Sequence, residues 1–281
     1  MEIIGLAKDA ARTIWRNKAL WFFGVFVAGG SGGGGGGTGG GGANGAGAAG
    51  TGTALPDWFW PVMAALAVFG LVMFLLHVVS EAALIEGVRK DRRDGARLGV
   101  KAGLREGLRH FWRVLGLKVG FGAVMTVTVA VVALPVLLGV LEVWPMGLGV
   151  ALMVLLALPA VPWLLTWYFV YEYGLRFCVL DGRGVREGAL RAYRFLHGRL
   201  VDSLKLLLVV VAGRAAGSVV AVALLVPVAA LAVGLYFAAG LPAALALGAG
   251  LGLPWVLVVN GATGAFGSTV WTLGVLQADA R

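Results

Sequence analysis

The stretch RLGVKAGLREGLRHFWR, from Arg97 to Arg113, decides how the rest of the chain is interpreted. Its cations recur at every fourth residue, at Arg97, Lys101, Arg105, Arg109 and Arg113. Because an α-helix has about 3.6 residues per turn, this spacing places the cations in a slowly drifting stripe on one side of a helix. The nearby apolar residues fall mostly on the other side, at Val100, Leu104, Leu108, Phe111 and Leu115. The stretch therefore predicts a helix on a membrane surface, with its cations toward lipid phosphates or water.

The composition of the whole chain supports a membrane location. Of the 281 residues, 59% are hydrophobic and 13% are charged, with a formal net charge of +9. A soluble domain is usually about 45–50% apolar and about 25% charged, so we expect an all-α polytopic membrane protein. In such a protein the positions of the cations matter more than their sum, and we expect no nucleic-acid partner. Cys178 is the only cysteine, which excludes an intramolecular disulfide.

Six apolar stretches are candidates for membrane-spanning helices. Five are long, and they cover approximately residues 58–80, 114–141, 147–170, 206–237 and 243–276. Residues 142–146 between two of them predict a tight turn. Prolines predict a kink in 147–170, and the glycines at 248, 250 and 252 predict a break in the last span. The stretch 206–237 is too long for one upright span, which predicts either a tilted helix that starts in the interface or a bend near Pro227.

The first apolar stretch, Ala19 to Ala28, is the weakest candidate. It is much shorter than the roughly 20 residues that a spanning helix needs. Residues 1–18 before it predict an amphipathic helix with a basic face. A cleavable signal peptide is the alternative, since cations precede a short apolar segment. The bulky Trp21, Phe22 and Phe23 and the lack of a clear cleavage site favour a retained helix.

A glycine-rich loop at residues 29–57 follows this helix. A phosphate-binding glycine loop needs a strand-to-helix context and usually a lysine, and neither is present. The segment therefore predicts a flexible tether outside the cytoplasm.

The charges are sorted along the chain in a way that predicts the topology. Lysines and arginines lie in residues 1–18, 81–118 and 172–205, with Arg214 and Arg281 besides. The other connections carry none. Because cationic loops stay in the cytoplasm, six crossings with both termini inside place every basic segment on one side. We therefore expect a multipass plasma-membrane protein with both termini in the cytoplasm.

Residues 58–141 and 147–239 share one layout, in which a span leads to a basic helix and the basic helix to a second span. The segment GLREGLRHFWR at 103–113 is echoed by GVREGALRAYR at 184–194. A parallel duplication and a chance similarity between two short amphipathic helices are both consistent with this pattern. The second segment adds Arg186, Arg191 and Arg194 to the candidate contacts for lipid headgroups.

Two stretches of the chain resemble a known family, and they are NKALWFFG at 17–24 before the glycine-rich loop and VLDGRGVREGALR at 179–191. The family consists of bacterial multipass proteins that are like the membrane domain of glycerophosphoryl diester phosphodiesterase. The resemblance implies a six-helix integral membrane protein. It does not imply the phosphodiesterase activity, because that activity belongs to a separate soluble domain.

The sequence contains no motif for catalysis, for a cofactor or for a metal. His77, His110 and His197 lie far apart and predict no metal site. Arg214 inside an apolar stretch marks either the inner headgroup level or, together with Asn260 in the last span, a polar site within the membrane. Small residues of the last span, and the pairs Gly116–Gly120 and Gly213–Gly217, predict close helix packing.

These observations favour a non-enzymatic membrane protein that engages anionic lipid, or a membrane or cytoplasmic protein partner, through its basic helices. The alternative is a small transporter for an unidentified solute.

Overall fold

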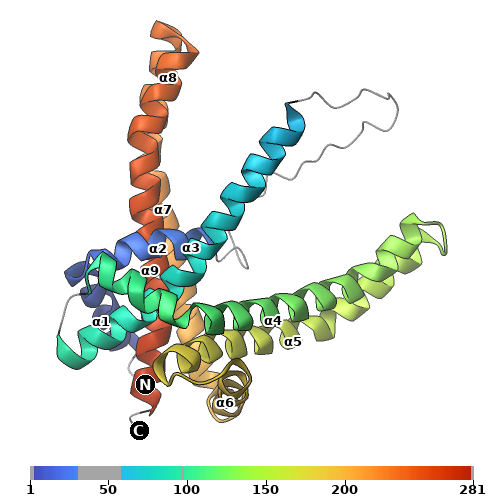
Figure 1. Cartoon of the computed structure of the whole chain (residues 1–281). Helices are drawn as coiled ribbons and strands as arrows, with labels where there is room; N and C mark the ends of the chain where they lie inside the picture. Colours follow the sequence, from blue (N-terminus) through green and yellow to red (C-terminus); the bar gives the residue numbers. More distant parts are fainter. Residues whose placement is uncertain (1–2, 31–57, 96–97, 280–281) are drawn as a thin grey trace. The chain divides into compact units, whose positions relative to one another are not determined.

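The computed structural model describes residues 3–30, 58–95 and 98–279. Every regular element within these ranges is helical, which confirms the predicted all-α fold (Figure 1). Arg97 and residues 31–57, which make up most of the glycine-rich loop, lie outside the described residues, so the predictions for them stay untested.

The described helices from α3 onward follow one another with short connections. Their bounds are α1 Ile3–Arg16, α2 Ala19–Gly30, α3 Phe59–Asp94, α4 Val100–Val140, α5 Met146–Leu180, α6 Val185–His197, α7 Leu200–Ala239, α8 Leu241–Leu247, the π-helical turn η1 Gly248–Gly252, and α9 Leu253–Asp279.

Five stretches of the described chain are long and apolar enough to cross a membrane: α3, α4, α5, α7 and the run from α8 to the end of α9. They correspond to the five long spans expected from the sequence. The sixth candidate, α2, is an apolar helix of 12 residues. At about 1.5 Å per residue it is about 18 Å long, whereas the hydrocarbon core of a bilayer is about 30 Å thick. In the structure too, the first predicted span is therefore shorter than the bilayer core.

Several of these helices extend beyond the predicted spans or through predicted bends. The helix α3 continues past Ser80 to Asp94, where Gly95 in the left-handed conformation (φ 63°) ends it. The helix α4 begins at Val100, so the basic stripe and the apolar stretch after it form one helix. The helices α5 and α7 are continuous through their internal prolines, and the kink predicted in α5 and the tilt or bend predicted in α7 stay predictions. The break expected in the last span is present as η1, an insertion typical of sites where a helix is locally distorted.

The contacts divide the chain into two units, which are described separately. The first unit consists of residues 1–7, 108–209 and 270–281. In it α4 and α5 form a long hairpin (Figure 1). The turn is closed by Trp144, whose Nε1 donates to the carbonyl oxygen of Pro135 at 2.8 Å. Gly149 packs on the same carbonyl, where a Cβ would lie 2.6 Å from the oxygen.

An aromatic cluster forms the buried end of the first unit. Tyr173 lies at its centre and makes edge-to-face contacts with Phe195 and Trp271. The Tyr173 hydroxyl donates to Ser203 Oγ at 2.7 Å. The cluster joins α5, α6, the first turn of α7 and the end of α9, because aromatic side chains bury large apolar areas in a fixed geometry.

The second unit consists of residues 8–107 and 210–269, and α2 lies in its core. Leu20, Phe23 and Val27 of α2 are buried against Ala83 and Leu84 of α3, with Ala265 of α9 in the same cluster. The backbones of α2 and α9 approach closely through Gly24, Gly261 and Gly264. Small residues permit this approach, as the sequence pattern of the last span predicted.

A second glycine seam joins α7 to α9 in this unit. Gly213 faces Phe266, and Gly217 faces Thr263. The predicted packing role of the Gly213–Gly217 pair is therefore confirmed. In the first unit, Gly116 of the other pair lies against Val185, but nothing described lies within 4 Å of the place that a Cβ on Gly120 would take, so that pair does not form such a seam.

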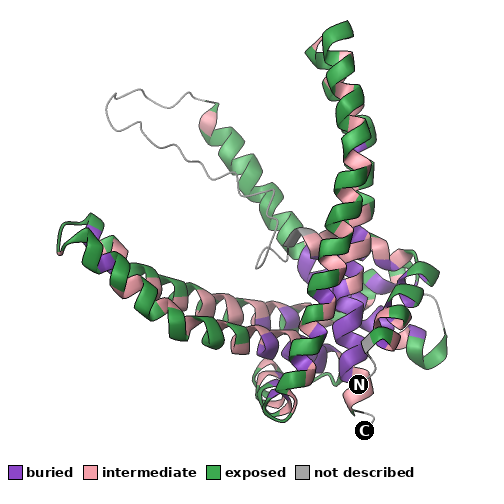
Figure 2. Ribbon diagram, turned by 180° about the vertical axis from the view of Figure 1, so that it is seen from behind, coloured by how far each residue is buried: buried purple, intermediate pink, exposed green. Residues whose placement is uncertain are grey.

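The apolar parts of the long helices are almost entirely uncovered by protein. In the most apolar 18-residue window of each of the five stretches, between 0% and 17% of the residues are buried. Figure 2 shows the same pattern, with burial concentrated at the charged ends of the helices. Apolar surface on this scale is typical of helices that face lipid.

The close contact between α2 and α9 leads to a test. A Cβ on Gly24 would overlap the carbonyl oxygen of Gly261 and lie 2.8 Å from the amide nitrogen of Ala265. Because both are backbone atoms, we expect Gly24→Ala to lower the free energy of unfolding by about 1–3 kcal/mol. Thermal unfolding of the purified protein in detergent measures the change.

Gly70→Ala in α3 is the matched control, since nothing described lies within 4 Å of a Cβ at that position. We expect its effect to stay within about 0.5 kcal/mol. Equal unfolding temperatures for the two variants would contradict the described packing of α2.

Candidate functional site

The first turns of α4 pack through glycine. A Cβ on Gly103 would lie 2.7 Å from the ring of Phe23, and a Cβ on Gly107 would lie 2.8 Å from Cγ1 of Val79. Both glycines are buried. The helix therefore turns its narrow glycine face to the protein, and its larger side chains remain outside.

The outer side of these turns carries two adjacent stripes, which together are named the α4 surface. One stripe is cationic and the other is apolar. Trp112 is 78% exposed and Leu108 is 57% exposed. The exposed residues of the α4 surface are Val100, Lys101, Leu104, Arg105, Leu108, Arg109 and Trp112. Cations beside an uncovered apolar stripe are typical of helices at a membrane interface.

The cations of the predicted stripe differ in their surroundings. Lys101, Arg105 and Arg109 make no ion pair or side-chain hydrogen bond with any residue that the structure describes. The guanidinium group of Arg113 instead lies close to Gly182, where a Cβ would be 3.2 Å from Nη1. The structure therefore supports a free cationic stripe for three of the five residues.

The stripe is not a separate surface helix, because α4 is continuous from Val100 to Val140. Arg105 lies 14 positions before Val119, where the uncharged apolar stretch begins. Along a helix axis this separation is about 21 Å. Hydropathy patterns alone did not reveal this continuity, since they locate apolar and charged segments but not the helix boundary between them.

The helix α6 repeats the arrangement of the α4 surface in the first unit. Gly188 is buried, and a Cβ there would lie 3.3 Å from the carbonyl oxygen of Gly174 on α5. Leu190, Tyr193 and the predicted contacts Arg186 and Arg194 are exposed. The two Arg-Glu-Gly segments thus pack alike, but α6 ends at His197 whereas α4 continues.

Arg191, the third predicted contact on α6, is already engaged by protein carboxylates. Its Nη1 donates to Asp181 at 2.6 Å, and its Nη2 donates to Asp279 near the end of α9 at 3.2 Å. Arg199 holds the same end of α9, because its Nη1 donates to the carbonyl oxygen of Ala278 at 2.7 Å. Asp279 is 88 positions away from Arg191 in sequence, so no local pattern could have predicted this pairing.

The structure does not bring Arg214 and Asn260 to one site. Arg214 is half-buried and lies beside Gly267, where a Cβ would be 3.8 Å from Nη2. Asn260 is exposed. Asn260 is seven positions before Gly267 on α9, so it lies about two helical turns, or about 10 Å, along the axis from the level of Arg214.

The structure reveals buried polar groups on α3 that the sequence analysis missed. His77 Nδ1 is 2.8 Å from the carbonyl oxygen of Phe26, and its Nε2 is 3.8 Å from Oε2 of Glu81. Glu81 and Glu86 are both buried. The four-residue spacing of His77 and Glu81 was a signal for their contact.

The histidines predicted to lie apart are not gathered at a metal site. The ring of His197 lies beside the ring of Tyr193 on α6 at an interplanar angle of 48°, far along the chain from His77. In the described ranges, no three side chains of histidine, cysteine, aspartate or glutamate are placed to hold a metal ion.

Arg176 and Glu172 form a buried ion pair on α5, which sequence reasoning also missed. The side chain of Arg176 is 2% exposed, and its Nη1 contacts both the carboxylate and the carbonyl oxygen of Glu172. The spacing of four residues was the available signal. A buried charge of this kind is stable only while its partner is present.

No family model, curated protein or solved structure matches this chain. The fold therefore defines the class: an all-α protein with five helical stretches, within the described residues, that are able to cross a membrane. The resemblance to the phosphodiesterase membrane domain stays a prediction.

Removal of the partner of Arg176 gives a test of the buried pair. Glu172→Gln leaves the guanidinium group without a counter-charge inside the protein, so we expect a loss of about 3 kcal/mol in the free energy of unfolding. Denaturant unfolding in detergent measures it. Asp202→Asn is the control, because Asp202 pairs with Lys205 on the surface at 4.0 Å, and exposed pairs contribute about 0–1 kcal/mol. Similar losses in the two variants would contradict the burial of the pair.

Proposed function

We propose that this chain is a non-enzymatic integral protein of a bacterial plasma membrane that binds anionic lipid through the α4 surface on the cytoplasmic side. The α4 surface is the observation that carries the proposal. It combines three cations that have no partner among the described residues with an apolar stripe that the described protein leaves uncovered.

The physical argument is that the two stripes suit the two layers of a membrane interface. Apolar side chains such as Leu108 and Trp112 favour the boundary of the acyl chains, where burial of apolar area contributes about 25 cal/mol per Å². Cations beside them attract anionic headgroups, with a contribution of about 1 kcal/mol per cation near the surface. Both stripes face away from the glycine side of α4, through which the helix packs.

The continuity of α4 adds a condition. An upright helix would carry Arg105 about 20 Å away from the apolar stretch, beyond the headgroups. Residues 119–140 are about 33 Å long and must cross a core of about 30 Å, so tilt alone does not bring Arg105 to the headgroups. The proposal therefore requires α4 to bend between the α4 surface and the crossing part, so that the whole α4 surface lies along the interface.

The proposed orientation follows the sorting of the cations. In the proposed orientation, both ends of the chain, the basic first turns of α4 and the helix α6 lie on the cytoplasmic side, and the turn at 141–145 lies outside. The six proposed crossings include the short helix α2, although Ala83 and Leu84 of α3, which cover its apolar side chains together with Ala265 of α9, lie outside the uncharged stretch of α3.

A small transporter is the second candidate function. The observation that favours it is Arg214, a half-buried cation within the apolar α7 that makes no ion pair with a described residue. Its position beside Gly267, close to where α9 becomes buried, also suits an anchor at the headgroup level. Arg214 thus has a structural explanation that does not involve transport. The described fold gives the exposed cations of the α4 surface no comparable structural role, so lipid binding is the better-supported function.

Charge reversal on the α4 surface tests the proposal. The full-length protein in mixed micelles is titrated with fluorescent phosphatidylglycerol, and retained lipid is measured. We expect Arg105→Glu and Arg109→Glu each to weaken retention by about fivefold or more, because each removes a cation that contributes about 1 kcal/mol and adds a repulsive charge.

Arg93→Glu is the matched control, since Arg93 has a 77% exposed side chain outside the α4 surface. We expect the control to retain lipid as the unaltered protein does. Equal loss in all three variants would indicate a general charge effect, and no loss in any of them would exclude the α4 surface as the lipid contact.

A further inference from the structure

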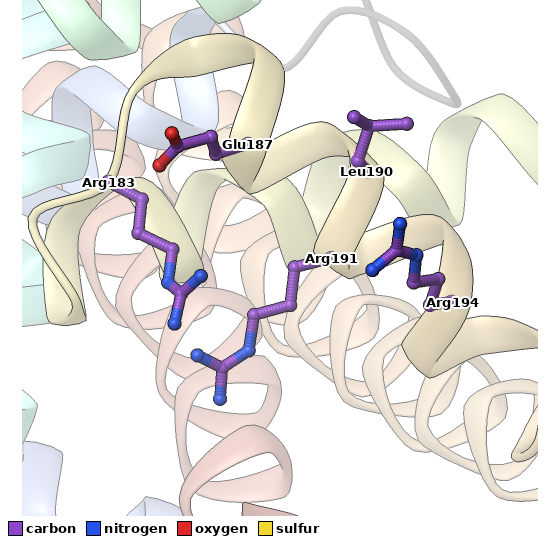
Figure 3. A pocket seen from close by; sticks show the side chains of 5 residues that line it. All are labelled: Arg183, Glu187, Leu190, Arg191 and Arg194. Atoms are coloured by element: carbon purple, nitrogen blue, oxygen red, sulfur yellow. The ribbon is translucent and has the colours of Figure 1, made fainter.

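The helix α6 and the turn before it form a recess of about 390 Å³, which we name the α6 recess (Figure 3). It is lined by Arg183, Glu187, Leu190, Arg191 and Arg194. The three other lining residues on α6 are spaced three, four and seven positions from Glu187, so all four share one face of the helix. Arg183 comes from the turn before α6.

Three of the five lining side chains are arginines. Arg183 Nε is 3.3 Å from Asp181 Oδ2, and Arg191 Nη1 is 2.6 Å from the same oxygen. One carboxylate outside the lining thus holds two guanidinium groups in place. Arg194 makes no ion pair with any residue in the described ranges. In Figure 3 the Glu187 carboxylate points away from the guanidinium groups of Arg191 and Arg194.

The chain places an anion of its own at the α6 recess. The Asp279 carboxylate accepts hydrogen bonds from Nη2 of Arg191 at 3.2 and 3.3 Å. This carboxylate is about half-exposed and carries one negative charge. It therefore occupies donors that an external anion of higher charge would use.

We propose that the α6 recess binds a phosphate group. Guanidinium groups donate paired hydrogen bonds in a planar fork that matches phosphate oxygens, and such charge-assisted bonds are stronger than bonds between neutral groups. A dianionic phosphate displaces the singly charged Asp279 from Arg191 and also engages Arg183 and Arg194. Leu190 and the volume of the recess leave room for an apolar substituent on the phosphate.

The same chemistry has two sources, a phosphomonoester lipid headgroup and a soluble phosphate. The site is separate from the α4 surface, so it stands even if the proposed function fails. The proposed function likewise stands if the α6 recess binds no phosphate. The two tests are independent, because neither charge reversal on α4 alters a residue of the recess.

Calorimetric titration of the full-length protein in detergent tests the assignment. The probes are inorganic phosphate, dihexanoyl phosphatidic acid and, as the neutral comparison, dihexanoyl phosphatidylcholine. We expect saturable binding of the first two probes and none of the third. Arg194→Gln should weaken the binding of both phosphates at least tenfold, because it removes a charged donor.

Arg186→Gln is the matched control. Arg186 is exposed on the same helix, and it does not line the α6 recess. The control should bind within twofold of the unaltered protein. Equal weakening by the two substitutions, or no saturable binding of either phosphate, would overturn the assignment.

Asp279→Asn supplies a second measurement. It removes the competing carboxylate, while Asp181 still holds Arg191 through Nη1. We therefore expect affinity for phosphate to rise severalfold, and an unchanged or lower affinity would count against the site. If phosphatidic acid binds at least tenfold more tightly than inorganic phosphate, the ligand is a lipid headgroup. Equal affinities identify a soluble phosphate.

Discussion

The cost of placing a charged side chain in hydrocarbon governs this molecule, because that cost is several kcal/mol for an unpaired charge. Charged side chains are absent from the apolar part of three helices, which covers residues 59–76 of α3, 119–140 of α4 and 215–239 of α7. At 1.5 Å per residue these stretches are about 27, 33 and 37 Å long, close to the thickness of a bilayer core. The charged residues lie at the other ends of the same helices, where protein contacts and headgroups compensate them.

Those charged ends are held by close helix contacts together with buried apolar clusters. Glycines let α2 approach α9, α4 approach α3 and α6 approach α5. This packing has a functional consequence, because a helix that is buried through its glycines keeps its long side chains on the outside. Lys101, Arg105 and Arg109 of α4 and Arg186 and Arg194 of α6 are exposed for this reason, and the neighbouring apolar residues remain uncovered.

Local sequence patterns were sufficient to predict the all-α fold, the five long apolar helices, the turn before Met146 and the irregular turn at Gly248–Gly252. They could not predict that α4 is continuous, because helix propensity carries no marker where an amphipathic segment meets an apolar one. They also missed the contacts of His77 with Phe26 and of Arg191 with Asp279, which join residues 51 and 88 positions apart. Tertiary packing, and not spacing, selects such partners.

Cysteine labelling in intact cells tests the central claim most directly. In a background where the buried Cys178 is replaced by serine, single cysteines at Val143, Arg93 and Arg186 are exposed to a membrane-impermeant maleimide. The account predicts labelling at position 143 alone, with positions 93 and 186 labelled only after the membrane is permeabilised. Labelling at position 93 or 186 in intact cells would show that the charged ends of the helices are not gathered on the cytoplasmic side, and it would contradict the account.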